Sequence, residues 1–345
     1  MPAIRIGLIG AGIITHDTHV PILKRYGRRF RVVAVADVLR PNAERVAAAI
    51  GRPGIAIDED HHRLLARDDV DAVLVAVPPY LSAQITIDAL RAGKHVLGEK
   101  PMANTVDEAR AIVRAWRRTD RVYMVAEQFF FIPAYERLRA IAANGDWPFG
   151  KPRMVSLNQY WKMSPYTIAK YYHSAWRHDK RLTWGYLLEG GCHTANPLRE
   201  AFGMPRRVRS RLLSVDRALG RYDTIIANFD FSSGPACQLT MAYAFRSEAG
   251  PIIEVFAKDG TISIDGGARG LHYTAEDGTK WSETDTGGED PYTRQWLHFH
   301  KVLSGGAPLA LTPQQTLDDL VFVQRLIDAA PEVAGASRSA RRTSR

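Results

Sequence analysis

The sequence predicts an α/β protein: an N-terminal, doubly wound parallel sheet, followed by a C-terminal α+β domain with a large, open, mostly antiparallel sheet. In the first part of the chain, short apolar runs alternate with helical segments, as in a parallel sheet covered on both faces. In the second part, strand-like segments follow one another directly, with D-G and G-G turns between them. The length of 345 residues fits about two domains.

Five apolar runs are the expected strands of the first domain. They are Ile4–Ile13, Arg31–Asp37, Val70–Pro79, Lys94–Pro101 and Val122–Phe129. We expect helices between them over 42–50 and 82–93, and a further helix that Thr105 and Glu108 open with a capping-box pattern. The alternation of strand and helix assigns residues 1–125 to this domain.

The second domain is expected over 126–335. Its clearest strand candidates are 153–161, 222–232, 236–245 and 252–265. A helix over 313–330 should close it, with Thr312 as N-cap, Pro313 at the first helical position and Gln315 completing a capping box. The last segment, 336–345, is polar, basic and aperiodic, and we expect it to be disordered.

Composition narrows the classes of function. The net charge of +9 raises the possibility of a nucleic-acid partner, but part of the excess is in the tail and no basic stripe alternates with aromatic residues. No apolar run approaches the roughly 20 residues that span a membrane. Two cysteines make no disulfide framework. We therefore expect a cytoplasmic protein with neither a nucleic-acid nor a membrane partner.

A glycine turn ends the first apolar run. Gly10 and Gly12 fit the first two positions of the G-x-G-x-x-G dinucleotide fingerprint, and Thr15 occupies the third. Asp37 follows the second strand, where an acidic residue binds the ribose hydroxyls and disfavours a 2′-phosphate. Arg40 is placed to accommodate such a phosphate. The unit predicts a Rossmann domain that binds NAD, with NADP possible.

Several motifs resemble the Gfo/Idh/MocA family of NAD(P)-dependent oxidoreductases, named after glucose–fructose oxidoreductase and inositol dehydrogenase. The resemblance covers nearly the whole chain except the tail. It rests on AGKHVLGEKP (92–101), AVPPYLSA (76–83), AEQFFFIPAY (126–135), FGKP (149–152), WGYLLEGGCHTANPLREAFG (184–203) and the helix from residue 312. It implies hydride transfer between nicotinamide and a hydroxyl or carbonyl group of a sugar, polyol or glycoside.

The resemblance also implies roles for three residues. Lys100 matches the lysine that hydrogen-bonds the reacting oxygen and orients the nicotinamide, and its bond to Pro101 is expected to be cis. His193 matches the proton-transferring histidine, since imidazole exchanges protons near neutral pH. Glu189 stands where many members have aspartate. Taken alone, Lys100 would more often be a solvated surface lysine and His193 a helix histidine with satisfied hydrogen bonds.

The resemblance extends the candidate sites. The cofactor-binding candidates are Gly10, Gly12, Ile13, Ile14, Asp37, Arg40, Val77, Pro78, Pro79, Glu99, Lys100 and Gln128. The substrate-binding candidates are Lys100, Tyr160, Trp176, Arg177, Glu189 and His193. No metal is expected. At three positions the sequence departs from the family pattern: Phe130 replaces an arginine, Ser82 a histidine and Asn196 an acidic residue.

The stretch LLEGGCHTA (187–195) places two glycines between Glu189 and His193. On a helix these two ionisable residues would share a face. We expect the glycines to remove side chains where a cofactor and a substrate approach. Pro197 leaves the His193 carbonyl without its helical donor and should kink the helix.

Aromatic residues are concentrated at 158–184, where they either stack on a sugar or fill core and interface space. The exposed face of the second sheet should pair with another copy, giving a homodimer or homotetramer. Besides a dehydrogenase or reductase, two other functions stay open. One is an NAD-dependent glycosidase or lyase that oxidises a sugar transiently. The other is a non-catalytic dinucleotide-binding protein.

Overall fold

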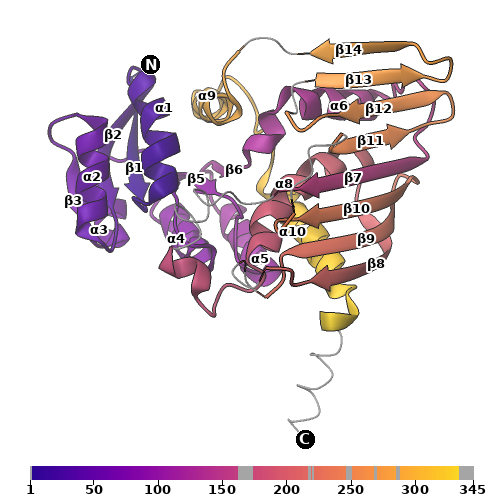
Figure 1. Ribbon diagram of the computed structural model, residues 1–345. Helices are drawn as coiled ribbons and strands as arrows, with labels where there is room; N and C mark the ends of the chain where they lie inside the picture. The colour runs from indigo at the N-terminus through magenta and orange to yellow at the C-terminus, as the bar shows by residue number, and fades with distance from the viewer. Residues whose placement is uncertain are drawn as a thin grey trace, which may run out of the picture. The chain divides into compact units, whose positions relative to one another are not determined.

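The computed structural model describes residues 2–161, 174–216, 219, 221–245, 251–267, 270–284 and 288–333. The chain packs into two compact units (Figure 1). Unit 1 contains 1–128, 180–183 and 289–318, and unit 2 contains 129–179, 184–288 and 319–345. Neither unit is continuous in sequence. The division into independent domains at residue 125 remains a prediction.

Unit 1 is built on a parallel sheet of six strands in the order β3-β2-β1-β4-β5-β6. The strands are β1 Ile4–Ile9, β2 Phe30–Ala36, β3 Ala56–Asp58, β4 Ala72–Val75, β5 His95–Glu99 and β6 Tyr123–Ala126. All five expected strands are present, and the order reverses beside β1, as in a Rossmann fold. Only β3 was not expected among the strands of this sheet, because it is three residues long and half-buried.

Helices accompany these strands. They are the π-helical turn η1 Thr15–His19, α1 Val20–Arg25, α2 Arg40–Ile50, α3 His61–Leu65, α4 Pro79–Arg91, α5 Val106–Trp116 and, from far along the chain, α9 Pro291–Leu303. The capping box of Thr105 and Glu108 is confirmed at α5. Trp296 and Phe299 of α9 are fully buried in the same core as Ile6 and Leu8 of β1. Helix α9 is therefore an integral part of unit 1.

Unit 2 is built on an eight-stranded sheet in the order β14-β13-β12-β11-β7-β10-β9-β8. The strands are β7 Met154–Tyr160, β8 Pro205–Leu213, β9 Thr224–Phe231, β10 Ala236–Ala242, β11 Ile253–Phe256, β12 Gly260–Ile264, β13 Gly270–Ala275 and β14 Lys280–Thr284. Strands β7 and β10 run parallel, and the other neighbours are antiparallel. The expected large, mostly antiparallel sheet is thus confirmed.

Helices cover one face of this sheet. They are α6 Pro133–Asn144, α8 Tyr186–Phe202 and α10 Pro313–Asp328, of which α10 enters unit 2 at Asp319; Figure 1 shows α6, α8 and α10 beside the strands. Along β10 the side chains of Cys237, Leu239 and Met241 are buried, whereas the alternate residues Ala236 and Gln238 are exposed. This period of two is the pattern of a strand with one covered and one open face.

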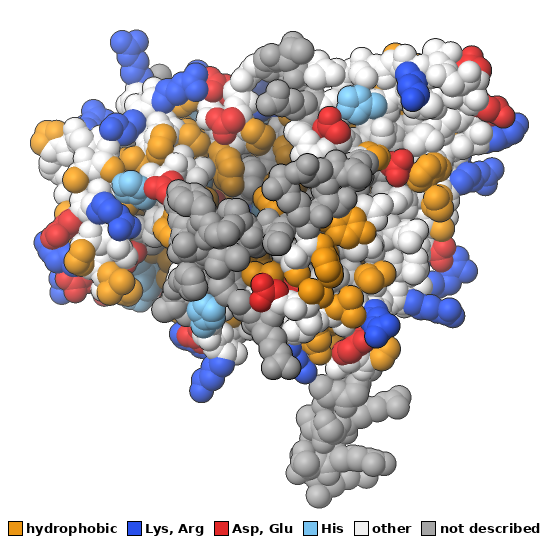
Figure 2. All heavy atoms as spheres, in the orientation of Figure 1, with side chains coloured by type: hydrophobic (Ala, Val, Ile, Leu, Met, Phe, Trp, Pro, Cys, Tyr) orange, Lys and Arg blue, Asp and Glu red, His pale blue; other side chains and the backbone are white. Residues whose placement is uncertain are grey.

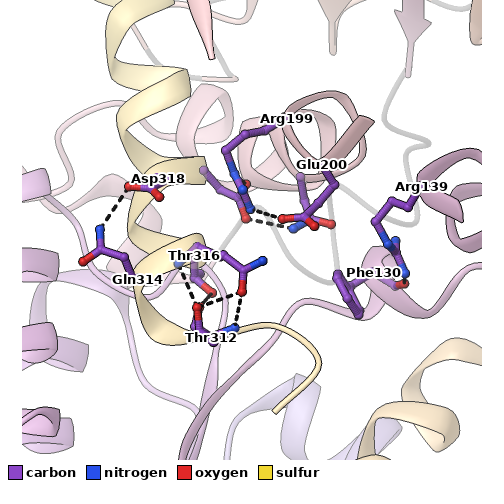
Figure 3. Close-up of polar contacts among 11 residues, drawn as sticks. Phe130, Arg139, Arg199, Glu200, Thr312, Gln314, Thr316 and Asp318 are labelled. Carbon is purple, nitrogen blue, oxygen red and sulfur yellow. Dashed lines mark hydrogen bonds and ion pairs between the residues drawn. The ribbon is translucent and has the colours of Figure 1, made fainter. Parts of the chain in front are cut away.

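A buried polar cluster joins α8 to α10 in unit 2. Asp319 accepts hydrogen bonds from Asn196 Nδ2 at 2.9 Å and from Arg199 Nε at 2.6 Å. Figure 3 shows Arg199 also directed at Glu200, an ion pair of 2.6 Å. The Asp319 side chain is only 1% exposed, so these partners compensate its desolvation. The cluster fixes the register between the two helices.

The start of α10 follows the expected capping box. Gln315 N donates to Thr312 Oγ1 at 3.3 Å, and Thr312 N donates to Gln315 Oε1 at 2.9 Å. Pro313 opens the helix, which ends at Asp328 rather than residue 330. Figure 3 shows the side chains of Thr312 and Thr316 close to each other at this turn.

Three further observations concern membrane-spanning helices, surface charge and the cysteines. Among the described residues, no helix combines the length and the apolarity that crossing a membrane requires. On the face drawn in Figure 2, acidic and basic side chains are interspersed. Cys192 and Cys237 are both described and buried, and they are not joined by a disulfide. The predicted cytoplasmic location stays a prediction.

Candidate active site

The cofactor-binding candidates of unit 1 gather at one edge of its sheet. Gly10 follows β1, Asp37 follows β2, Val77 follows β4, Lys100 follows β5 and Gln128 follows β6. Because all these strands are parallel, their carboxyl ends meet at the same edge. In open α/β sheets this edge, beside the reversal of strand order, is where ligands bind.

The glycine turn after β1 has the properties of a phosphate cradle. Gly10 has φ +92°, and a Cβ there would lie 2.1 Å from the Ala76 carbonyl oxygen, so only glycine fits. A Cβ on Gly12 would meet nothing within 4 Å, which leaves its backbone open to a ligand. Thr15, at the third fingerprint position, donates from Oγ1 to the Gly10 carbonyl at 2.7 Å and closes the turn itself.

Ile13 and Ile14 lead from this turn into the helical segment η1–α1. The first N–H groups of a helical segment have no partner within it, and they favour anions. The open backbone at Gly12 and these N–H donors therefore suit a pyrophosphate.

Asp37 is oriented by the backbone around it. Its Oδ2 accepts from Ala11 N at 2.7 Å and its Oδ1 accepts from Leu39 N at 2.8 Å. A carboxylate has about four lone-pair positions, so acceptor capacity remains for ribose hydroxyls. Arg40 is paired elsewhere: its Nε donates to Glu44 at 2.9 Å, and its Nη1 lies 3.9 Å from Glu59. The arrangement suits a ribose that carries two hydroxyls.

The remaining candidates of this edge come from three short segments. Val77 precedes Pro78 and Pro79, which form the N-cap and first residue of α4. Gln128 Nε2 donates to the Tyr292 hydroxyl at 3.0 Å, while its buried Oε1 has no hydrogen-bond partner. A buried polar atom without a partner is uncommon, and it fits a site for a polar ligand.

Glu99 and Lys100 stand at the end of β5. The Lys100–Pro101 bond is cis, as expected. Glu99 Oε2 accepts from Lys100 N at 3.1 Å, and Glu99 Oε1 lies 2.9 Å from Nε2 of the buried His19. The backbone that carries Lys100 is thus held by the preceding side chain.

The substrate-side candidates of unit 2 center on α8. Glu189 and His193 are both on this helix, where the i and i+4 spacing gives them a common face, and both are buried. The Phe129 ring stacks on the His193 imidazole, with centroids 4.3 Å apart and planes 16° from parallel. Thr194 donates to Gln159 Oε1 at 2.6 Å, which joins α8 to β7. The stack sets the plane of the imidazole, and the Thr194–Gln159 hydrogen bond fixes the neighbouring turn of the helix on the sheet.

Arg177 connects the short 3₁₀ turn Ala175–His178 to the same helix. Its Nη2 donates to Glu189 Oε2 at 2.9 Å, and its guanidinium carbon lies 4.1 Å from the centre of the Trp176 ring. Both side chains of the ion pair are largely buried. Glu189 therefore has Arg177 as a partner, a pairing that sequence spacing alone did not suggest.

Tyr160 ends β7 with 37% of its surface exposed. Part of the aromatic stretch beyond it, residues 162–173, lies outside the described residues, and with it several side chains that either bind a sugar or fill core and interface space. Those residues are Lys162, Tyr166, Tyr171, Tyr172 and His173.

One expectation about α8 needs revision. A Cβ on Gly190 would lie 1.5 Å from the Tyr243 hydroxyl oxygen, and a Cβ on Gly191 would lie 3.0 Å from both methyl groups of Val323. The protein's own packing thus requires Gly190 and leaves little room for a side chain at Gly191, and the expectation that the glycines make room for a cofactor and a substrate was wrong. Helix α8 continues through Pro197 to Phe202, and the kink expected at Pro197 stays a prediction.

The positions that depart from the family pattern also have structural partners. Arg139 donates to the Phe130 carbonyl at 2.7 Å and places its guanidinium 3.7 Å from the ring centre of Phe130. Ser82 donates to the Met102 carbonyl at 3.1 Å. The Arg139 guanidinium therefore packs on the Phe130 ring, so an arginine is present beside the position where the family pattern has one.

Sequence reasoning missed Phe129, His19 and Trp296. Phe129 lay inside a recognised motif, AEQFFFIPAY, but nothing indicated which of the three aromatic residues would stack on His193. His19 and Trp296 are 277 residues apart, and their hydrogen bond depends on where α9 docks. The helical segment after the glycine turn contains two histidines, His16 and His19, and the sequence did not indicate which of them is buried against α9.

A parallel sheet with a glycine turn, an oriented acid after β2 and a lysine after β5 defines a nicotinamide-dinucleotide-dependent oxidoreductase. Family models confirm this class. Residues 4–127 match the oxidoreductase family with an NAD-binding Rossmann fold, and residues 135–263 match the Gfo/Idh/MocA C-terminal domain. The chain belongs to the Gfo/Idh/MocA family, and it is an NAD(P)-dependent oxidoreductase.

Individual relatives agree with the family. The chain is 34% identical to dTDP-3,4-didehydro-2,6-dideoxy-α-D-glucose 3-reductase of Streptomyces violaceoruber over 63% of this chain and 60% of the relative. It is 32% identical to inositol 2-dehydrogenase of Klebsiella pneumoniae over 44% of each chain. An oxidoreductase of Thermotoga maritima has a similar structure, with TM-score 0.86 and 27% identity over 95% of this chain and 97% of that one.

Proposed function

We propose that this protein transfers a hydride between NAD and a CH–OH carbon of a sugar, polyol or glycoside. The main support is the carboxyl edge of the unit 1 sheet, where the Gly12 cradle, the oriented Asp37 and the anchored Lys100 come together. The relatives that act on inositol and on a dTDP-sugar support the substrate class.

Bound NAD would supply the hydride acceptor, and the chain's own residues would do the remaining work. The N–H groups after Gly12 and the carboxylate of Asp37 bind the pyrophosphate and the adenosine ribose. Lys100 donates a hydrogen bond to the reacting oxygen and stabilises the negative charge that develops there. His193 accepts the hydroxyl proton during oxidation and returns it during reduction.

The substrate-side residues position the sugar-like molecule. The Arg177–Glu189 ion pair offers donors and acceptors that are already oriented, and Phe129 holds the ring plane of His193. Trp176 supplies an aromatic face for the apolar side of a sugar ring, whereas Tyr160 lies on the open face of the sheet, opposite the residues that face α8. Because Glu189 compensates the charge of Arg177, this group of residues favours a neutral polyol or sugar over a sugar phosphate.

We further propose that the open face of the unit 2 sheet pairs with a second copy of the chain. Met154, Tyr160 and Ile226 expose 37–41% of their surface on described strands of this sheet. Native mass spectrometry of the intact chain should show a dimer or tetramer, and Ile226→Asp should shift it toward monomer.

The experiment that tests the catalytic proposal is a panel of sugars, polyols and glycosides, incubated with NAD and followed by NADH absorbance. We expect NADH formation with at least one polyol or sugar. A glycoside cleaved without net NADH would indicate the transient-oxidation mechanism instead. Failure of every compound, in a chain that binds NADH, would contradict the proposal.

A further inference from the structure

Three buried side chains form a hydrogen-bonded series in unit 1 that ends at Lys100. Trp296 Nε1 donates to His19 Nδ1 at 2.9 Å. His19 Nε2 lies 2.9 Å from Glu99 Oε1. The other carboxylate oxygen of Glu99 accepts from the backbone N–H of Lys100. Trp296 and His19 are both 0% exposed, so water does not compete for these contacts.

The chemistry of the indole sets the direction of the whole series. An indole N–H can only donate, so His19 Nδ1 must be the acceptor. A neutral imidazole then carries its proton on Nε2, which donates to Glu99. Trp296 thereby fixes the tautomer of His19, and His19 fixes the carboxylate of Glu99. Because an indole does not give up its proton at physiological pH, the series ends there and orients groups without conducting protons.

Helix α9, which carries Trp296, is held firmly on unit 1. Arg25 makes two hydrogen bonds to Glu289, at 2.7 and 2.8 Å, just before the helix. Asp290 caps the first turn through the N–H groups of Tyr292 and Thr293. The Trp296 ring packs edge-on against Phe30, with centroids 5.0 Å apart. The indole donor therefore has a defined position.

We propose that Trp296 and His19 are positioning residues for Lys100, acting through Glu99; this inference rests on the role of Lys100 in the proposed function. Trp296 orients His19, His19 holds one oxygen of the Glu99 carboxylate, and the other oxygen accepts from the Lys100 backbone N–H at the carboxyl end of β5. The Lys100 side chain then extends from a backbone whose position is fixed, beside the nicotinamide half of the cofactor. The adenosine half, bound at Gly12 and Asp37, does not depend on this series.

This separation of the two halves makes the proposal testable on the intact chain. ADP-ribose is the dinucleotide without its nicotinamide ring and keeps the parts that bind at Gly12 and Asp37, whereas NADH also contains the nicotinamide. The dissociation constants of both, measured by calorimetry, give an affinity ratio for each variant. Trp296→Phe removes the indole N–H and keeps an aromatic ring, and His19→Leu removes both hydrogen bonds of the imidazole.

We expect both variants to weaken NADH binding about fivefold relative to ADP-ribose, the effect of roughly one hydrogen bond. His19→Gln, which restores an N–H donor toward Glu99, should recover part of the ratio. The matched control is Phe299→Leu, because Phe299 packs against Trp296 but makes none of these hydrogen bonds. It should lower the melting temperature and leave the ratio unchanged.

A purely structural role would predict a different result. All variants, including Phe299→Leu, would lose stability, and the ratio of NADH to ADP-ribose affinity would stay at the wild-type value. That outcome would overturn the proposal. A wild-type chain that binds NADH and ADP-ribose normally but oxidises no polyol would count against the proposed function alone, because the affinity ratio would still be readable.

Discussion

Arg177 and Glu189 form an ion pair of 2.9 Å whose two side chains are only 14% and 9% exposed. The pair joins the turn that carries Trp176 to the helix that carries His193. It shows that the glutamate four residues before His193 has an arginine partner, which the i and i+4 spacing did not reveal.

Removal of one partner should destabilise the protein, because the other charge is then left buried without its counter-ion. We expect Arg177→Met to lower the free energy of unfolding by about 3 kcal/mol. The double variant Arg177→Met with Glu189→Gln should recover part of this loss. The control is the exposed pair Arg137–Glu283, where Arg137→Met should cost less than about 1 kcal/mol. Equal effects in urea unfolding at the two sites would contradict this view of the buried pair.

Cofactor choice should depend on Asp37. Its carboxylate repels a 2′-phosphate, so the wild-type protein should prefer NAD over NADP. We expect Asp37→Ala to reduce the ratio of kcat/KM for NAD to that for NADP at least tenfold, a change of about 1.4 kcal/mol. Arg40→Gln should change the ratio little, because Arg40 is paired with Glu44. A large loss of NADP use in Arg40→Gln would instead identify Arg40 as a phosphate partner.

Two glycines should respond to alanine in opposite ways. Gly190→Ala places a methyl group against the Tyr243 ring and should cost about 1–3 kcal/mol of stability, with NAD affinity retained. Gly12→Ala points into open space and should leave the melting temperature nearly unchanged while NAD binding weakens. Thermal unfolding with and without NAD measures both quantities. Loss of NAD affinity in Gly190→Ala, in a folded protein, would restore the idea that this glycine faces a ligand.

Lowering the pH should reduce the stability of unit 1, because His95 becomes protonated. Burial, assisted by the positive charge of Arg121, lowers the pKa of His95, and its Nδ1 accepts from Val122 N at 2.9 Å. Since the folded-state pKa lies below the unfolded value of about 6.5, protonation favours the unfolded chain, and stability falls as pH drops below that value. His95→Asn keeps an acceptor and does not titrate. The unfolding free energy of the wild type should fall relative to this variant between pH 7.5 and 5, and a constant difference would refute the assignment.

Local sequence patterns predicted many of the strands and helices, because apolar runs and capping residues act between residues that are close in sequence. The apolar runs gave all five expected strands of unit 1, and the capping residues Thr105 and Thr312 marked their helices correctly. The glycine turn with Asp37 identified the cofactor edge. What sequence reasoning could not supply were contacts between distant segments, such as the Trp296–His19 hydrogen bond, and packing against specific side chains, such as Tyr243 against Gly190. The motif glycines were therefore misinterpreted, although the helix that contains them was expected.

The most direct test of the central claim is the rate of NADH formation by Lys100→Ala and His193→Ala on the best substrate from the panel. The account predicts that each variant stays folded, still binds ADP-ribose, and loses kcat by about 10²–10⁴-fold, the range that a positioned proton-transfer group contributes. Phe130→Leu, outside the proposed proton path, should lose far less. Wild-type kcat values in both Lys100→Ala and His193→Ala would contradict the account.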